Sequence, residues 1–401
     1  MLVGVGILLV ALNLRPAITS IGPLLSQIQA GLGMSGTTAG LLATLPALCF
    51  GAFSGLTPRL IRRFGAHRVL LVAMAGLLAG LALRPFATTT GVFIAASVVC
   101  LAGIAAGNVT LPALVRAHFP ERIGLVTGLY TMVMNLGTAL GAALAVPAAD
   151  ISGGWRGGLG AWAAIAVVGL LPWLGAIRAD RGRTPTAATT ALRVRPARTR
   201  LGWALAVYMG TQSLQAYVVF GWLARIFTDA GYPPGTAGLL VSVVTAIGMP
   251  IALLLPTLAG RGASQRPYVV LLIGCYIAGY LGLMFWPHAG AVIWAVLIGI
   301  GGGAFPLALL MVGLRSRTPA GTSSLSAFAQ SVGYLIAAVG PVLVGYLRDA
   351  TGGWDVPIVF LLVVLVPQLF SGLAAGRPRC LEDEPGAIAA TGDDDSHLPV
   401  R

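Results

Sequence analysis

The chain has 401 residues, of which 57% are hydrophobic and 9% are charged, and its mean hydropathy is +0.89. A soluble globular protein of this size carries about 25% charged residues, so the composition excludes a soluble fold and indicates a membrane protein. The formal net charge of +13 comes with 25 basic residues, all of them Arg. Most of these lie between apolar runs, where they report membrane topology, and they do not indicate a nucleic-acid partner.

Apolar runs recur along the whole chain, each close to the length of about 20 residues that crosses a bilayer as a helix. The runs are too long for the alternating strands of a membrane barrel. We therefore predict an all-α polytopic membrane protein with twelve transmembrane helices. The predicted spans cover residues 2–28, 37–57, 69–88, 91–116, 124–148, 158–177, 202–226, 236–258, 268–286, 289–314, 322–346 and 356–375.

The first predicted span carries a charged residue, Arg15, near its middle. A guanidinium at the membrane midplane costs about 2.5–3.5 kcal/mol on insertion scales, and it keeps its proton. Thr19 lies one helical turn further on, on the same face, and Asn13 lies just before. We interpret Arg15, Asn13 and Thr19 as part of a binding site for a small anion. The structural alternative is an Arg that snorkels, or one satisfied by backbone carbonyls where Pro16 removes a donor.

Arginines gather in alternate loops, most densely at 58–68 and at 178–200. The second segment holds seven Arg among Thr, Ala and Pro, which is typical of a flexible linker. Because basic loops stay on the cytoplasmic side, we predict that both termini are cytoplasmic, and that the tail 376–401 is disordered there. Outside the segments so assigned lie five Arg: Arg15, Arg84, Arg156, Arg225 and Arg348.

Short motifs repeat between the two halves of the chain at nearly constant spacing. Thr38–Leu42 recurs as Thr236–Leu240, and the Gly-Gly-Trp at 153–155 recurs at 352–354. The Gly103/Gly107 pair, whose spacing lets helices approach closely, recurs as Gly299/Gly303. We therefore predict two pseudo-symmetric six-helix bundles, 1–177 and 201–375, joined by the linker 178–200. This is the arrangement of the major facilitator superfamily.

Polar side chains follow helical stripes in the predicted spans 5, 7 and 11. Amides do not face hydrocarbon, so these stripes are expected to face the bundle interior or a wet cavity. In the repeat, the position equivalent to Arg15 is about Ser213, which is next to Gln212. We therefore expect Arg15 and Gln212 to face each other between the halves. Hydrogen bonding between packed spans is the structural alternative. The candidate substrate-binding residues on these stripes and nearby are Asn108, Tyr130, Asn135, Tyr208, Gln212, Gln215, Gln330 and Tyr334.

No acidic residue lies in the middle of a predicted span; all of them fall at span ends, in loops or in the tail. Arg15 is therefore predicted to be the only charge deep in either bundle. A lone guanidinium with neutral donors suits a small anion or a polar planar molecule. The four Cys have neither metal-site nor disulfide spacing, and no catalytic motif is found. We expect no cofactor, no metal and no enzymatic activity.

The fifth predicted span partly resembles the antiporter signature G-x8-G-x3-G-P. Gly128, Gly137 and Gly141 fit this signature, and Ala142 stands where the Pro should be. The alternative function is therefore a drug or metabolite efflux proton antiporter. The missing intramembrane acid weakens this alternative, because proton-coupled carriers commonly use one.

Four stretches together resemble the cyanate and nitroimidazole porter family within the major facilitators: Asn13–Ala17, Leu111–Val115 followed by Phe119–Arg122, Gln215–Trp222 and Ser326–Tyr334. The resemblance extends to about residue 375. It implies a secondary transporter that moves a cyanate-like anion, or a small polar planar compound such as a nitroimidazole, across a bacterial cytoplasmic membrane by alternating access. We expect a monomer in the lipid bilayer, with a small-molecule substrate as its partner.

Overall fold

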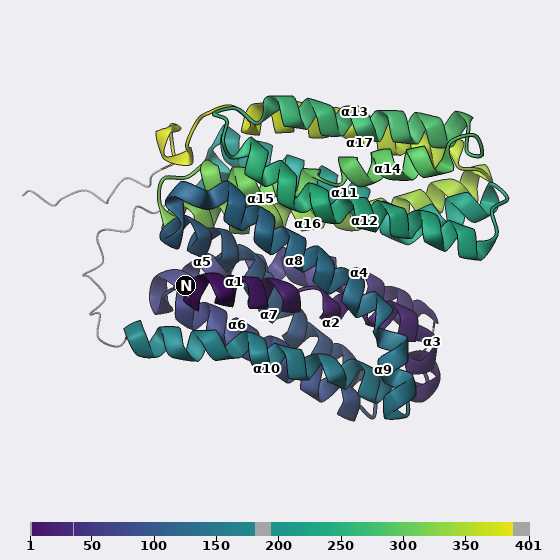
Figure 1. Ribbon diagram of the computed structural model, residues 1–401, viewed down its shortest axis with the longest axis horizontal. Helices are drawn as coiled ribbons and strands as arrows, with labels where there is room; N and C mark the ends of the chain where they lie inside the picture. The colour runs from purple at the N-terminus through teal and green to yellow at the C-terminus, as the bar shows by residue number, and fades with distance from the viewer. Residues whose placement is uncertain (1, 35, 181–193, 388–401) are drawn as a thin grey trace, which may run out of the picture.

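A computed structural model describes residues 2–34, 36–180 and 194–387, and it arranges their helices in two bundles (Figure 1). The N-terminal half contains α1 (Leu2–Asn13), α2 (Pro16–Thr19), α3 (Ile21–Leu32), α4 (Gly36–Ser54), α5 (Thr57–Phe64), α6 (Ala66–Leu83), η1 (Arg84–Phe86), α7 (Thr90–His118), η2 (Pro120–Arg122), α8 (Ile123–Ala143), α9 (Ala145–Ser152) and α10 (Trp155–Asp180). The C-terminal half contains η3 (Pro196–Arg198), α11 (Arg200–Asp229), α12 (Pro234–Ala259), α13 (Arg266–Phe285), α14 (Ala291–Gly301), α15 (Ala304–Leu314), α16 (Pro319–Thr351), α17 (Asp355–Ala375) and η4 (Leu381–Asp383).

The predicted all-helical polytopic fold is confirmed. Within the described ranges, ten helical stretches are long and apolar enough to cross a membrane. The helices α4 and α11 occupy the two remaining predicted positions, the second and the seventh. In α11 the polar stripe of the seventh span lowers the hydropathy, and in α4 the apolar stretch is described over Thr44–Ser54.

Two spans are broken near their middle. The first span breaks between Asn13 and Pro16. A Pro has no N–H to continue the helix, and its fixed φ favours the first turn of a new one. The carbonyl of Arg15 then accepts hydrogen bonds from the N–H groups of Ile18 and Thr19 at 3.0 and 3.1 Å. The tenth span breaks between α14 and α15 at Gly302. The first break leaves Arg15 outside the regular helices, so its guanidinium is placed by a local turn.

We call the end where α10 stops and α11 starts the linker end, and the opposite end the far end. At the linker end α8 of the first half packs against α12 of the second. A Cβ on Gly124 would lie 2.5 Å from the carbonyl oxygen of Pro256, and one on Gly128 would lie 2.6 Å from that of Leu253. Side chains cannot occupy such space, so these glycines allow the two halves to close on each other at the linker end.

A side chain at Gly128 is expected to force this contact apart. In Gly128→Val, the halves should separate at the linker end, because the carbonyl of Leu253 belongs to the backbone of α12 and cannot move alone. Spin labels at residues 122 and 261 should report longer distances by pulsed electron resonance. Gly221→Val is the matched control, since a Cβ on Gly221 meets no atom within 4 Å. Unchanged distances in Gly128→Val would contradict the role of this contact.

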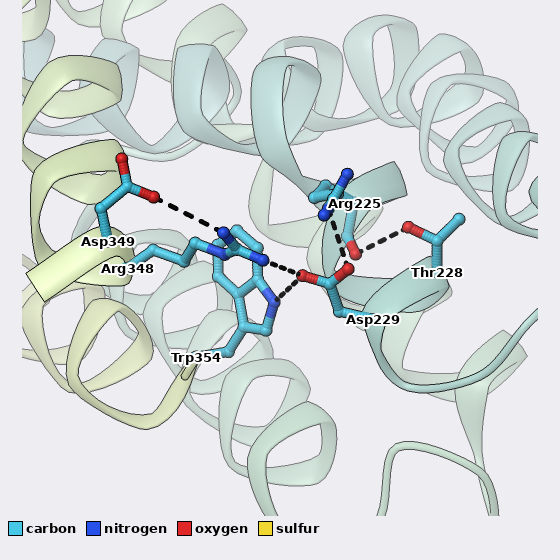
Figure 2. A network of polar contacts seen from close by, with 6 residues as sticks. All are labelled: Arg225, Thr228, Asp229, Arg348, Asp349 and Trp354. Atoms are coloured by element: carbon cyan, nitrogen blue, oxygen red, sulfur yellow. Dashed lines mark hydrogen bonds and ion pairs between the residues drawn. The ribbon is translucent and has the colours of Figure 1, made fainter. Parts of the chain in front are cut away.

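The far end of the C-terminal half is tied together by polar contacts around Asp229 (Figure 2). Its carboxylate accepts from Arg348 at 2.9 Å, from the indole of Trp354 at 3.1 Å, and from Arg225 at 2.8 Å. Partial desolvation would raise the pKa of Asp229, but these hydrogen bonds outweigh it and hold that pKa below its ordinary value. These contacts, which join α11, α16 and the start of α17, therefore persist at neutral pH. They are lost only as the pH falls through the lowered pKa of Asp229.

The structure differs from the expectation of a disordered tail beginning at residue 376. Residues 376–387 pack on the linker end of the C-terminal half, with Leu381 completely buried. Glu384 accepts a hydrogen bond at 3.1 Å from the backbone N–H of Leu201, in the first turn of α11. A carboxylate is favoured there because the first N–H groups of a helix lack partners within it. The rest of the predicted disordered tail, and most of the predicted linker, lie outside the described residues.

Candidate functional site

Arg15 lies between the two halves. Its guanidinium carbon is 5.3 Å from the ring centroid of Phe305, at the start of α15, and Tyr217 and Tyr334 lie close to it. Arg15 is half-buried, and no ion pair to a carboxylate is described for it anywhere in the chain that the structure covers. A cation whose neighbours are ring faces and hydroxyl groups keeps N–H donors available for a ligand.

Buried polar atoms lie at the interface near this guanidinium. Tyr334 is 2% exposed, and its hydroxyl lies within hydrogen-bonding reach of Arg15. Gln330, one turn before Tyr334, is 1% exposed, and its Oε1 makes no hydrogen bond among the described residues. Nδ2 of Asn108 also makes none there. Buried polar groups are normally satisfied, so one donor and one acceptor at this interface could bind a polar ligand.

Three amide and hydroxyl contacts cross from one half to the other. Nε2 of Gln330 donates to the carbonyl of Asn108 at 3.3 Å, and Nδ2 of Asn135 donates to the carbonyl of Gly248 at 3.3 Å. The hydroxyl of Thr131 donates to the carbonyl of Ala252 at 2.9 Å. Gln330, Asn108 and Asn135 therefore lie at the interface between the halves.

Other predicted site residues of the N-terminal half contact their own half. Nδ2 of Asn13 donates to the carbonyls of Leu9 and Ile165, the latter on α10. The hydroxyl of Thr19 donates to the carbonyl of Arg15 at 3.3 Å. Tyr130 is 1% exposed within the apolar core. For these three residues the hydrogen bonds and burial agree with the structural alternative, packing between helices.

The seventh-span candidates also turn into their own half. Gln215 donates to the carbonyl of Leu361 at 2.9 Å and accepts from the hydroxyl of Tyr280 at 2.8 Å. Tyr208 is completely buried, against Gly372 of α17. Nε2 of Gln212 donates to the Ser213 hydroxyl and to a backbone carbonyl of α11. Within the described chain no contact joins Gln212 to Arg15, so the expected pairing of these two residues is not seen.

Arg15 is not the only charge deep in the molecule, which corrects the expectation from the sequence. Arg84 is 0% exposed, and it donates to the carbonyl of Ala17 at 2.6 Å and to the hydroxyl of Ser97 at 3.0 Å. Its guanidinium thereby holds α2, the short helix that follows Arg15. The sequence signal was an Arg at the end of an apolar span, which hydropathy alone reads as an interfacial residue. Phe305 and Tyr217 were also missed, because aromatic residues are common in any span.

The groups gathered here are ones that could recognise a ligand. They are one positive charge, ring faces, an unpaired donor on Asn108 and an unpaired acceptor on Gln330. No group of three or more His, Cys, Asp or Glu residues in the described ranges could hold a metal ion. A planar anion could accept from the guanidinium through two parallel hydrogen bonds and lie against a ring face.

Comparisons with known proteins agree with this architecture. A model of the Major Facilitator Superfamily matches residues 7–341. The chain is 35% identical to the 2-nitroimidazole transporter of Escherichia coli (strain K12), over 93% of this chain and 95% of that protein. It is 30% identical to the cyanate transport protein CynX of the same organism, over 87% and 90%. Among solved structures, the proton:xylose symporter XylE superimposes with a TM-score of 0.73 at 13% identity, covering 95% of this chain and 97% of that one.

Proposed function

The chain belongs to the Major Facilitator Superfamily and groups with its cyanate and nitroimidazole porters, and we propose that it carries a small anion or a small polar planar organic compound across the bacterial cytoplasmic membrane by alternating access. The observation that carries this proposal is the position of Arg15. Its guanidinium lies at a helix break between the halves, over a ring face, with no described carboxylate to neutralise it. The substrate supplies the missing negative or electron-rich group.

The neighbours of Arg15 favour a planar substrate. The ring centroids of Phe50 and Tyr334 lie 5.0 Å apart, and Phe305 lies under the guanidinium, so aromatic side chains line this part of the interface and favour a flat substrate whose acceptor atoms meet Arg15. The free acceptor on Gln330 suits a substrate that also carries an N–H or O–H donor. An N–H azole with a nitro group, or a hydroxylated arene carboxylate, has both features; cyanate has only the first.

Access to this site is set by the closed linker end. The basic loops place the linker end in the cytoplasm. The contacts at Gly124 and Gly128 close that side, so the arrangement corresponds to the state that receives substrate from outside. The alternative of a proton-coupled efflux antiporter gains no support from the site, since the acidic residues of the described chain lie at helix ends or in the tail.

The proposal is tested by uptake into proteoliposomes. Radiolabelled cyanate, 2-nitroimidazole and 4-hydroxybenzoate are offered separately, with a sugar and an organic cation as negative controls. We expect saturable uptake of at least one of the first three compounds, and none of the controls. Bound substrate should also raise the unfolding temperature of the purified protein. Uptake of the cation instead of the anions would refute the anion site.

The amides of Gln330 and Gln215 provide a matched pair. In Gln330→Ala, the loss of one hydrogen bond to substrate should weaken binding by about 1 kcal/mol, or roughly fivefold. In Gln215→Ala, the contacts to Leu361 and Tyr280 are lost; the unfolding temperature should fall while the affinity stays close to that of the wild type. Substrate titrations by calorimetry and thermal unfolding separate the two effects. Equal affinity losses in both variants would contradict the assignment of Gln330 to the site.

A further inference from the structure

A cavity lies at the far end of the N-terminal half, outside the proposed substrate site. It has a volume of about 610 Å³ and opens between the end of α6, η1 and the start of α10. Arg84 of η1 points away from the cavity, toward Ala17 and Ser97. The next two residues of η1, Pro85 and Phe86, line the cavity. Its lining includes Ala82, Pro85, Phe86, Thr88, Arg156 and Gly160.

One guanidinium supplies the charge of this cavity, and it is held in place. Nη2 of Arg156 donates to the carbonyl of Ala87 at 3.1 Å, and the guanidinium carbon lies 4.4 Å from the ring centroid of Trp155. Trp155 is itself buried and packs edge-on against Phe93. The described contacts of Arg156 with protein atoms use a single nitrogen as a donor, so the remaining N–H groups of this pre-positioned cation can bind an anion.

The rim of the cavity is apolar and exposed. Phe86, which lines the cavity, is 79% exposed, and Leu83, next in sequence to the lining residue Ala82, is 52% exposed. In a chain that spans the membrane, such side chains meet acyl chains, and an Arg at the end of a span places its charge near the lipid headgroups. The cavity thus combines a fixed cation with walls that suit hydrocarbon.

We propose that this cavity, which we name the Arg156 pocket, binds an anionic phospholipid of the leaflet at the far end, its phosphate on the guanidinium of Arg156 and its chains along Phe86 and Leu83. A free anion would leave the apolar rim exposed, which is why the lipid is the better occupant. A comparison of the two repeated halves shows that only the N-terminal half has the residues of this pocket. At the equivalent positions of α17, Asp355 replaces Arg156 and Val359 replaces Gly160, so the charge is inverted and a side chain replaces the glycine.

The pocket should discriminate between headgroups. Purified protein in detergent is titrated with short-chain phosphatidylglycerol, phosphatidylcholine or glycerol phosphate, and bound lipid is counted by native mass spectrometry. One basic residue near an anionic headgroup contributes about fivefold in affinity. The wild type should prefer phosphatidylglycerol to phosphatidylcholine by about that factor, and Arg156→Gln should bind both equally. Arg225→Gln is the control, because Arg225 lies at the same end in the other half and should leave the preference intact.

A second variant tests the cavity instead of the charge. A Cβ on Gly160 would lie 3.2 Å from Pro85, so Gly160→Leu places its side chain in the cavity and should reduce binding of both lipids while Arg156 remains. Three results would overturn the proposal. They are an unchanged preference in Arg156→Gln, binding of glycerol phosphate as tight as that of the lipid, and a concentration-dependent dimer that Arg156→Gln abolishes.

Discussion

Arg15→Ala is expected to abolish substrate binding and transport while the protein still inserts and folds. The guanidinium lies at the interface between the halves, over the ring of Phe305 and beside the Tyr334 hydroxyl, so its removal leaves only neutral donors for the substrate. Arg15 is half-buried and forms no ion pair with any described residue, so its loss leaves no described carboxylate buried without a partner. Uptake into proteoliposomes and the substrate-induced rise in unfolding temperature are measured together, because the second requires binding but no transport.

Arg15→Lys is the sharper variant. The charge remains, but an ammonium cannot present the planar pair of N–H groups that binds a carboxylate or nitro group through two hydrogen bonds. Most of the affinity should therefore be lost despite the conserved charge. Arg225→Lys serves as the control, since its exposed ion pair with Asp229 contributes little. Wild-type transport in Arg15→Ala would return Arg15 to the structural alternative, a cation held by its local surroundings near Pro16.

Arg84→Ala is expected to cause the largest loss of stability among single changes near the site. The change leaves the carbonyl of Ala17 and the hydroxyl of Ser97 without their partner and opens a cavity where a completely buried side chain lay. Unsatisfied buried groups cost about 1–3 kcal/mol and a cavity adds to that, so we expect a loss of roughly 3 kcal/mol. Because Ala17 belongs to α2, the turn at Arg15 should loosen and substrate affinity should fall as well.

Ser97→Ala is the matched control, since it removes only one of the two contacts of Arg84. Its cost should be about 1 kcal/mol, with the hydrogen bond to Ala17 and the substrate affinity retained. Thermal unfolding in detergent and substrate titration are compared for the two variants. If Arg84→Ala unfolds at the temperature of the wild type, the guanidinium does not hold α2, and the turn at Arg15 is maintained by Pro16 alone.

The sequence by itself determined the membrane class and the helical spans, and it singled out Arg15. Backbone polar groups must be satisfied inside hydrocarbon, so long apolar runs become helices whatever surrounds them. A charge within such a run is expensive, so Arg15 stands out in the printed residues without any neighbour being known. The glycine pairs follow the same logic: Gly103 meets the backbone of α6, and Gly137 and Gly141 meet the first span, as their small-residue spacing predicts.

Only the tertiary structure decided what each polar side chain contacts. Helical periodicity shows that Gln212 and Gln215 lie on one stripe, but the partner of an amide comes from another helix. Gln215 therefore bonds to α17 and α13, whereas Gln330 faces α7 across the halves. The same holds for Arg84, whose two partners are distant in the sequence. Spacing along one helix fixes which residues share a face, and the packing of the other helices fixes whether that face meets a neighbour, lipid or substrate.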